Sequence, residues 1–483
     1  MTLERRTFIK GSAAVAGGVA MAGPFAGLVA GPASALGPAP FRGLRPIPDR
    51  RDGKVRLHLP EGFAYRSFHD TEQTVVLDDE TVLPGRHDGM GAFDGPGGAV
   101  TLIRNHEVNN PVEAPFGPVG DHTYDTRAGG GCTHIDVSAH GRVRHAYTAL
   151  NGTMMNCSGG QMPWGAWVTC EETVNGPDVG PDFTGTSNVP LTQPHGYIFE
   201  VPVDGHASGR PITKAGRFPH EAVSFDPREG RLYLTEDNFA FPSGFYRYVP
   251  RARRDGHRAL DHNGQLQMLA VAGRPQAHLE AHQDTTTVHD VEWVDIDEPD
   301  FEFDYTPGEP APTSNDTAIN FVGDQGRAKG AAHFSRCEGQ VFHDGVVYFT
   351  ATQGGGEAMT GPDNVNGYGR GWGQVWGYDT RTQTLRCVYQ SESREVLDFP
   401  DNVTTSPRGT LVLCEDHDQG NYLRGLTTEG DLFSIARNAM PGREGDEFAG
   451  STFSPDGHTL FVNIQASRGL TFAILGDWAS IGV

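Results

Sequence analysis

Long apolar segments are scarce in this 483-residue sequence. Beyond residue 35, no part of the chain approaches the ~20 consecutive apolar residues that a membrane-spanning helix requires. Helical periodicity is also nearly absent there. These absences argue against a helical bundle, and we expect no stable membrane anchor.

Positive charge is in short supply as well. The chain has 38 Lys and Arg residues against 61 Asp and Glu residues, which gives a formal net charge of −23. Sequence-independent binding of nucleic acid needs a basic face, and the sequence offers no long one. We therefore expect no nucleic-acid partner. Clustered carboxylates suit hard divalent cations, although a solvated acidic surface explains the composition equally well.

Several catalytic motifs are missing. The sequence has no G-x-S-x-G, G-x-x-x-x-G-K-[ST] or H-E-x-x-H motif, and no G-x-G-x-x-G after a strand. This argues against serine hydrolases, P-loop enzymes, zinc peptidases and dinucleotide-binding enzymes. The six cysteines include no C-x-x-C pair, so zinc fingers and a disulfide scaffold are disfavoured. We expect most of them to be small buried hydrophobic residues, with Cys157 as the exception.

The amino terminus is typical of an export signal. Residues 4–10, ERRTFIK, resemble a twin-arginine signal, and a Gly- and Ala-rich stretch leads to an A-x-A cleavage site at Ala33-Ser34-Ala35. We assign residues 1–35 to a signal peptide and expect the twin-arginine export machinery as a partner. The mature protein would then be periplasmic, bound in the cell envelope or extracellular. This route implies a protein that folds before export, often around a cofactor.

Short strands and turns dominate the rest of the chain. Gly and Pro total 97 of 483 residues, from 64 Gly and 33 Pro. Short β-branched or aromatic runs such as Arg231–Thr235 and Thr410–Cys414 are bounded by turn-forming residues. Their even spacing predicts an all-β fold: a six-bladed β-propeller with loop insertions, forming one domain over 36–483. Asp255–Asp316 is the main expected insertion, and a decorated β-sandwich is the alternative.

The most unusual segment runs from Asn151 to Glu172 and reads NGTMMNCSGGQMPWGAWVTCEE. Two glycines soon after Cys157 allow close approach of the backbone, and a strand then delivers the carboxylates of Glu171 and Glu172. A thiolate beside carboxylates suits a transition metal. A buried cysteine beside a turn is the alternative interpretation.

Further acidic residues stand where predicted strands end. They are Glu107, Glu221, the pairs Glu236-Asp237 and Glu415-Asp416, and Asp401 with Asn402. Like charges held close together repel, and a multivalent cation removes that cost. Each group alone is typical of a solvated strand end, but their number predicts a shared metal site.

Arg336 stands two residues before Glu338, so the two side chains share one face of an extended segment. A guanidinium is a fork-shaped donor for phosphate or carboxylate groups. Arg336 could therefore line the same cavity as the carboxylates. The alternative is a surface ion pair that contributes little.

In this order, the motifs resemble those of the PhoX-type alkaline phosphatase family. They lie at 156–165, 170–172, 216–222, 234–237, 336–339, 400–402, 414–416 and 448–465. The resemblance covers nearly the whole mature chain. It implies a six-bladed propeller with extensions that hydrolyses phosphate monoesters at a cluster of two ferric irons with calcium ions. A small phosphomonoester is then the expected substrate.

The resemblance also implies roles for individual residues. Cys157 would bind iron, with carboxylate ligands from Glu172, Glu221 and Glu338, and Arg336 would hold the substrate phosphate. Calcium ligands are expected among Glu107, Glu171, Glu236, Asp237, Asp401, Asn402, Glu415 and Asp416. The family leads us to expect a further basic residue before Cys157, but residues 147–155 contain no Lys or Arg.

Other functions stay open at this point. One is a calcium-dependent propeller hydrolase that acts as a lactonase or phosphotriesterase. Another is a non-catalytic binding propeller in which metal ions only stabilise the fold. A redox role for an iron–cysteine site is a further possibility.

Overall fold

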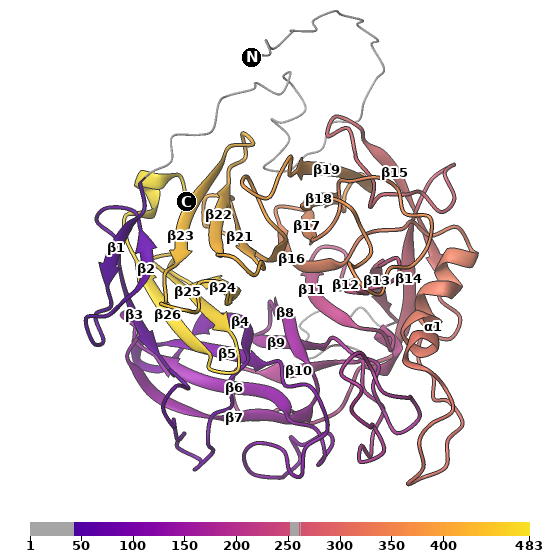
Figure 1. Cartoon of the computed structure of the whole chain (residues 1–483), viewed down its shortest axis with the longest axis horizontal. Helices are drawn as coiled ribbons and strands as arrows, with labels where there is room; N and C mark the ends of the chain where they lie inside the picture. The colour runs from indigo at the N-terminus through magenta and orange to yellow at the C-terminus, as the bar shows by residue number, and fades with distance from the viewer. Residues whose placement is uncertain (1–42, 252–259, 261) are drawn as a thin grey trace, which may run out of the picture.

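The computed structural model describes residues 43–251, 260 and 262–483 (Figure 1). The predicted signal peptide and its cleavage site lie outside these ranges. Nearly all regular structure consists of antiparallel β-strands arranged around a central axis. The all-β prediction is confirmed.

The first three blades are numbered in chain order, and each begins with the strand nearest the axis. Blade 1 contains β4 (His87–Asp94), β5 (Val100–His106), β6 (Gly130–Val137) and β7 (Val143–Thr153). Blade 2 contains β8 (Asn156–Met162), β9 (Ala166–Glu171) and β10 (Ile198–Pro202). Blade 3 contains β11 (His220–Asp226), β12 (Arg231–Glu236), β13 (Phe245–Pro250), β14 (Gly264–Val271) and β15 (His289–Asp295).

The last two of the remaining three blades include strands from the amino-terminal end. Blade 4 contains β16 (Cys337–His343), β17 (Val346–Ala351), β18 (Gln374–Asp379) and β19 (Thr384–Gln390). Blade 5 contains β20 (Pro400–Thr405), β21 (Leu411–Glu415), β22 (Tyr422–Leu426) and β23 (Leu432–Asn438), extended by β2 (Val55–Leu59) and β1 (Arg45–Pro48). Blade 6 contains β24 (Glu447–Phe453), β25 (Thr459–Gln465), β26 (Leu470–Leu475) and β3 (Ala64–Phe68).

The inner strands form a closed ring. β4, β8, β11, β16, β20 and β24 contact one another in that order, and β24 returns to β4. This arrangement is a β-propeller, so the alternative of two facing sheets in a sandwich is wrong. The described residues form five hydrogen-bonded sheets rather than six separate ones. There is one sheet fewer than there are blades because β15 pairs with β19 and joins blades 3 and 4 into one sheet.

Hydrophobic side chains fill the space between successive blades, with a core cluster at each of the six junctions. All six cysteines are buried and free. Five of them, Cys132, Cys170, Cys337, Cys387 and Cys414, pack in these inter-blade cores, as the sequence predicted. Cys157 belongs to none of the cores.

The segment expected to be an insertion is partly regular. Residues 255–259 and 261 of this segment lie outside the described ranges. The described part includes β14 and β15, which are outer strands of blade 3, so the prediction of an insertion or excursion is wrong for these strands. The helix α1 (Asn315–Ala328) follows, and the sequence interpretation missed it. Its amino terminus is capped by Ser314, whose hydroxyl accepts a hydrogen bond from Thr317 N at 3.2 Å. Among the described residues, no helix has both the length and the apolar character to cross a bilayer.

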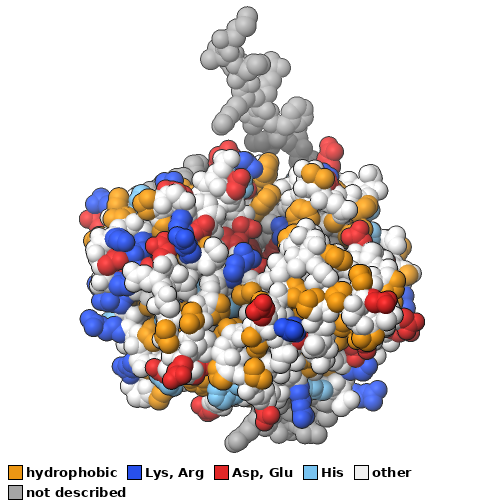
Figure 2. Space-filling model, turned by 60° about the horizontal axis from the view of Figure 1, so that its bottom comes forward, with side chains coloured by type: hydrophobic (Ala, Val, Ile, Leu, Met, Phe, Trp, Pro, Cys, Tyr) orange, Lys and Arg blue, Asp and Glu red, His pale blue; other side chains and the backbone are white. Residues whose placement is uncertain are grey.

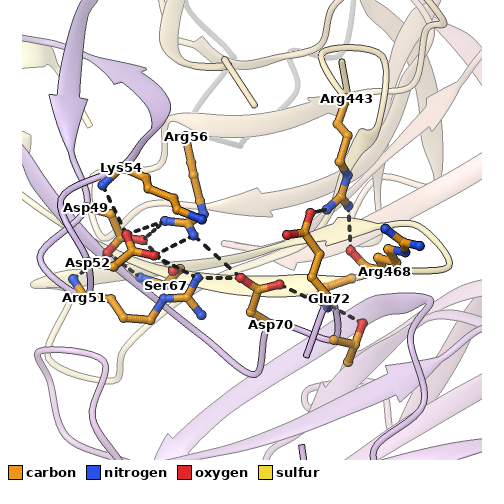
Figure 3. Close-up of polar contacts among 12 residues, drawn as sticks. Asp49, Arg51, Asp52, Lys54, Arg56, Ser67, Asp70, Glu72, Arg443 and Arg468 are labelled. Atoms are coloured by element: carbon orange, nitrogen blue, oxygen red, sulfur yellow. Dashed lines mark hydrogen bonds and ion pairs between the residues drawn. The ribbon is translucent and has the colours of Figure 1, made fainter. Parts of the chain in front are cut away.

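The two ends of the described chain close the ring. β3 pairs with β26 in blade 6, and β2 pairs with β23 in blade 5 (Figure 1). An ion-pair network holds the segment from Asp49 to Asp70, which contains β2 and β3 (Figure 3). Arg56 is buried and contacts Asp49 and Asp52, each at 2.8 Å, and Asp49 also accepts hydrogen bonds from Ser67. Opposite charges held together in the interior compensate one another's desolvation.

We expect Asp49→Ala to weaken this closure. It would leave Arg56 without its most buried partner, a loss of about 3 kcal/mol, which lowers the unfolding temperature by about 3 °C in a chain of this size. Thermal unfolding followed by circular dichroism measures the change. Asp52→Ala is the matched control: its side chain is 31% exposed, so its effect should be clearly smaller. Equal losses in the two variants would contradict this account.

Candidate metal centre

All six inner strands share one irregularity near their starts. In each blade the pairing between the inner strand and the second strand slips by one residue, which defines a β-bulge. The first extra residue of each bulge faces the same end of the ring. In chain order, these residues are Asp88, Cys157, Glu221, Glu338, Asp401 and Gly450. Five of the six blades thus place a carboxylate or thiol there.

The backbone before each bulge is unusual too. Arg86, Met155, Arg336 and Phe399 precede inner strands in four blades and have positive φ angles between 37° and 52°. This left-handed conformation is uncommon for residues other than glycine and concentrates at functional sites. The carbonyl groups of these four residues accept hydrogen bonds of 2.9–3.1 Å from the N–H groups of Glu107, Glu172, Thr352 and Asp416. The same backbone geometry therefore positions a second set of side chains beside the bulge residues.

The two sets of side chains meet in three overlapping groups of possible metal ligands. These are Asp88 with Glu107 and Cys157, Cys157 with Glu172 and Glu221, and Glu221 with Glu338 and Asp401. Within each group, the ligand atoms lie within 4.8 Å of one another. Cys157 donates a hydrogen bond to Glu172 Oε2 at 2.6 Å. We refer to these seven residues as the axial cluster.

Burial and mutual repulsion dominate the electrostatics of the axial cluster. Burial, followed by repulsion from Glu107, raises the pKa of Asp88 to about 7. Burial and neighbouring carboxylates also raise the pKa of Glu221 well above its usual range. The pKa of the Cys157 thiol rises for the same reasons, with Glu172 as the nearest contributor. A multivalent cation would favour the charged forms of all these groups.

Two arginines flank the cluster from opposite blades. Arg336 in blade 4 pairs with Asp237 at 2.6 Å and with Glu338 Oε1 at 3.0 Å. Arg86 in blade 1 pairs with Glu107. Both residues occupy the left-handed position two residues before a bulge residue. Their side chains are 17% and 41% exposed, whereas five of the seven cluster residues are buried and Glu172 and Asp401 are half-buried. Figure 2 shows acidic side chains in a hollow near the middle of one face, with basic side chains beside them.

Asp416 and Asn402 lie beside the axial cluster. Repulsion from Asp416 helps to raise the pKa of Asp401. The Asn402 amide donates to Asp401 Oδ1 and accepts from Gly450 N, each at 2.9 Å. Gly450 has a φ of 59°, and a side chain there would collide with the Asp88 carbonyl. Blade 6 therefore supplies backbone where the other blades supply a ligand.

Six predicted ligands are not members of the axial cluster. Asp237, Asn402 and Asp416 lie beside it, whereas the other three point away from it. Glu171, Glu236 and Glu415 precede the cluster-facing residues Glu172, Asp237 and Asp416, and successive side chains of a strand point to opposite faces. Their carboxylates are hydrogen-bonded elsewhere: Glu171 by His195 and three backbone N–H groups, Glu236 by Tyr246 and Gly244, and Glu415 by Arg424 and Tyr422.

The sequence interpretation missed Asp88, Arg86 and Glu447. Glu447 begins β24, and burial with repulsion from Asp416 raises its pKa well above the usual range. The sequence did contain a signal for Asp88 and Arg86. Residues 86–89 read RHDG and residues 336–339 read RCEG, the same pattern of Arg, any residue, an acid and Gly. The repeat marks corresponding positions in blades 1 and 4.

A cavity of about 460 Å³ continues along the axis beside the cluster. It is lined by all six inner strands, and its polar lining residues, among them Ser158, Gln161, Gln340 and Thr404, are neutral. The lining of this cavity therefore contains no charged side chain.

The raised pKa values predict how the cation-free protein responds to pH. Between pH 3.8 and about 7, the folded state holds a proton on Asp88 that the unfolded state has lost, so stability falls as pH rises through this window. Glu221→Gln removes one of the carboxyl groups whose ionisation burial and repulsion oppose. At pH 8 with a chelator, the variant should unfold about 2 °C above the wild type, the scale of removing one uncompensated buried charge.

When divalent or ferric ions are restored, Glu221→Gln should unfold at a lower temperature than the wild type, because the variant has lost a metal ligand. Differential scanning calorimetry measures both conditions. Glu236→Gln is the control, since it lies outside the cluster and should destabilise the protein to the same extent with and without cations. A Glu221→Gln variant that is less stable in both conditions would contradict the account.

Comparisons with known proteins give two kinds of result. A search of curated proteins finds no significant match. Solved structures that are similar include a catalytically inactive virginiamycin B lyase from Staphylococcus aureus, with 10% identity, a TM-score of 0.38, and coverage of 86% of this chain and 99% of that chain. A gluconolactonase from Xanthomonas campestris has 11% identity, a TM-score of 0.35, and coverage of 84% and 99%. Similarity at this level carries no argument about function.

The comparison with protein-family models identifies the family of this chain. The family model "Alkaline phosphatase PhoX" matches residues 43–146 and 138–467, which include all six inner strands and every member of the axial cluster. The resemblance drawn from the motifs is confirmed, and the chain belongs to the PhoX alkaline phosphatase family.

Proposed function

We propose that this chain is an exported, metal-dependent phosphatase that hydrolyses small phosphate monoesters. The observation that carries the proposal is the position of Arg336 beside a buried cluster of carboxylates and one thiol. A phosphate group needs positive charge around it, and the arrangement offers a guanidinium together with ligands for cations. Membership of an alkaline phosphatase family supports the same reaction.

The ligand types fit the metals that the family implies. Cys157 with Glu172 and Glu221 combines a soft thiolate with carboxylates, which suits iron. Glu221 with Glu338 and Asp401 supplies oxygen atoms alone, which suits calcium. When bound, such ions neutralise phosphate charge and activate water at neutral or alkaline pH.

The chain's own residues would orient the substrate. Asp237 contacts Arg336 through Nε and Nη2, which fixes the plane of the guanidinium. Thr352 donates a hydrogen bond to Glu338 Oε1 at 3.1 Å, which holds that carboxylate in place. A guanidinium held in this way stabilises negative charge that develops on the transferring phosphoryl oxygens. Arg86 supplies positive charge from the opposite blade, in place of the basic residue expected before Cys157.

The alternatives are less well supported. A calcium-dependent lactonase or phosphotriesterase would need a site made of oxygen ligands, but Cys157 belongs to two of the three ligand groups. A binding propeller with purely structural metals would not need an arginine at the open end of the cluster. Export by the twin-arginine route remains part of our proposal, supported by residues 4–10 and the A-x-A site.

Arg336→Met tests the proposal. We expect kcat/KM for p-nitrophenyl phosphate to fall about 100-fold, the scale of removing one donor that stabilises transition-state charge. Metal content, measured on the same samples, should stay close to that of the wild type. Arg468→Met, in an exposed loop, is the control and should keep full activity. Unchanged hydrolysis in Arg336→Met, or a wild type that is inactive when fully loaded with metal, would overturn the proposed function.

A further inference from the structure

Arg104 in β5 is a buried cation without an anionic partner. Its side chain is fully buried, and its guanidinium forms one hydrogen bond, from Nη1 to Thr471 Oγ1 at 2.9 Å. The buried Nε and Nη2 atoms have no hydrogen-bond acceptor in the described part of the chain. Burial lowers the pKa of Arg104 to about 9, which leaves the group charged at pH 7. Buried charges are normally paired, because the cost of desolvation is otherwise uncompensated.

Two other buried arginines, Arg217 and Arg56, show the usual arrangement. Arg217 makes two contacts with Asp178, at 2.6 and 2.8 Å. Arg56 contacts Asp49 and Asp52, as Figure 3 shows. Arg104 has the same burial as these residues but no carboxylate partner in the described ranges. A counter-charge from outside the chain would resolve the difference.

The surroundings of Arg104 suit an anion rather than a cation. His106 stands two residues after Arg104 in β5, so the two side chains share one face of the strand, and its ring packs against that of His87 with the ring centroids 5.2 Å apart. Arg104 also lies close enough to His69 to lower its pKa. Both ring nitrogens of His106 are hydrogen-bonded, to Gly85 O and Thr133 Oγ1. The buried His69 Nδ1 has no partner. A guanidinium repels metal ions, whereas unpaired N–H donors attract negative charge.

We propose that a small monovalent anion, chloride, binds beside Arg104 at the junction of blades 1 and 6. The Arg104 guanidinium supplies a single positive charge, and one chloride balances it. The site joins the two blades, because Arg104 lies in β5 while Thr471 lies in β26 and His69 follows β3. It is distinct from the axial cluster and does not depend on the proposed phosphatase activity.

The chloride site would support one wall of the metal centre. Thr471 donates to Asn463 Oδ1 at 2.5 Å, and Asn463 Nδ2 donates to the Asp88 carbonyl at 2.5 Å. A chain of three contacts therefore links Arg104 to the backbone of a residue in the axial cluster. Chloride would hold Arg104, the first residue in this series of contacts, in position.

Bromide tests the site directly. Crystals of the full-length protein grown in bromide salts should show an anomalous difference peak in contact with the Arg104 guanidinium. Crystals of Arg104→Met should lack this peak. A wild-type crystal with only water at Arg104 would overturn the proposal, whatever the protein's activity.

Thermal unfolding provides the second test. At constant ionic strength, replacing gluconate with chloride from 5 to 200 mM should raise the unfolding temperature of the wild type by about 2 °C, as expected for a ligand with millimolar affinity. Arg104→Met should lose this dependence on chloride, whereas Arg56→Met should keep it. The same chloride response in wild type and Arg104→Met, or none in the wild type, would contradict the proposal.

Discussion

Repulsion among buried carboxylates is the constraint on which the centre of this protein depends. The axial cluster gathers six carboxylates and one thiol in a buried space, and burial raises the pKa of each. A chain that folded only for stability would not assemble such a group. The inter-blade cores and the closure of the ring by β3 and β26 hold these side chains together against their repulsion. Bound cations would turn that repulsion into attraction.

The propeller supplies the geometry by repeating one local structure. Each inner strand starts with a bulge, and the residue at the bulge faces the axis. Sequence variation at this single position then sets the chemistry: a thiol in blade 2, acids in four blades and glycine in blade 6. Arg86 and Arg336 exploit another repeated position in opposite blades. A candidate metal centre flanked by two guanidinium groups thus arises from small changes in a common blade.

Much of this arrangement could be predicted from the sequence. Turn-rich spacing of short strands indicated the propeller, and the motifs around Cys157, Glu221, Glu338 and Asp401 indicated residues that the structure brings together. Asp88 and Arg86 were missed although residues 86–89 repeat the pattern of residues 336–339, because the meaning of that pattern depends on the bulge, which is a property of pairing between strands. For a related reason, the sequence did not distinguish the two members of the pairs Glu171-Glu172, Glu236-Asp237 and Glu415-Asp416. Only one member of each pair can face the axis, and the register decides which one. The helix α1 was missed because its apolar stripe is weak and it owes its position to packing against blade 3.

The central claim is that Cys157 and its neighbouring carboxylates bind metal ions together. Elemental analysis of the purified wild type, Cys157→Ala and Cys387→Ala tests it most directly, because both cysteines are buried but only Cys157 belongs to the axial cluster. The account predicts iron and calcium in the wild type and in Cys387→Ala, and loss of iron in a folded Cys157→Ala variant. A wild type without bound metal, or Cys157→Ala with the full metal content, would contradict it.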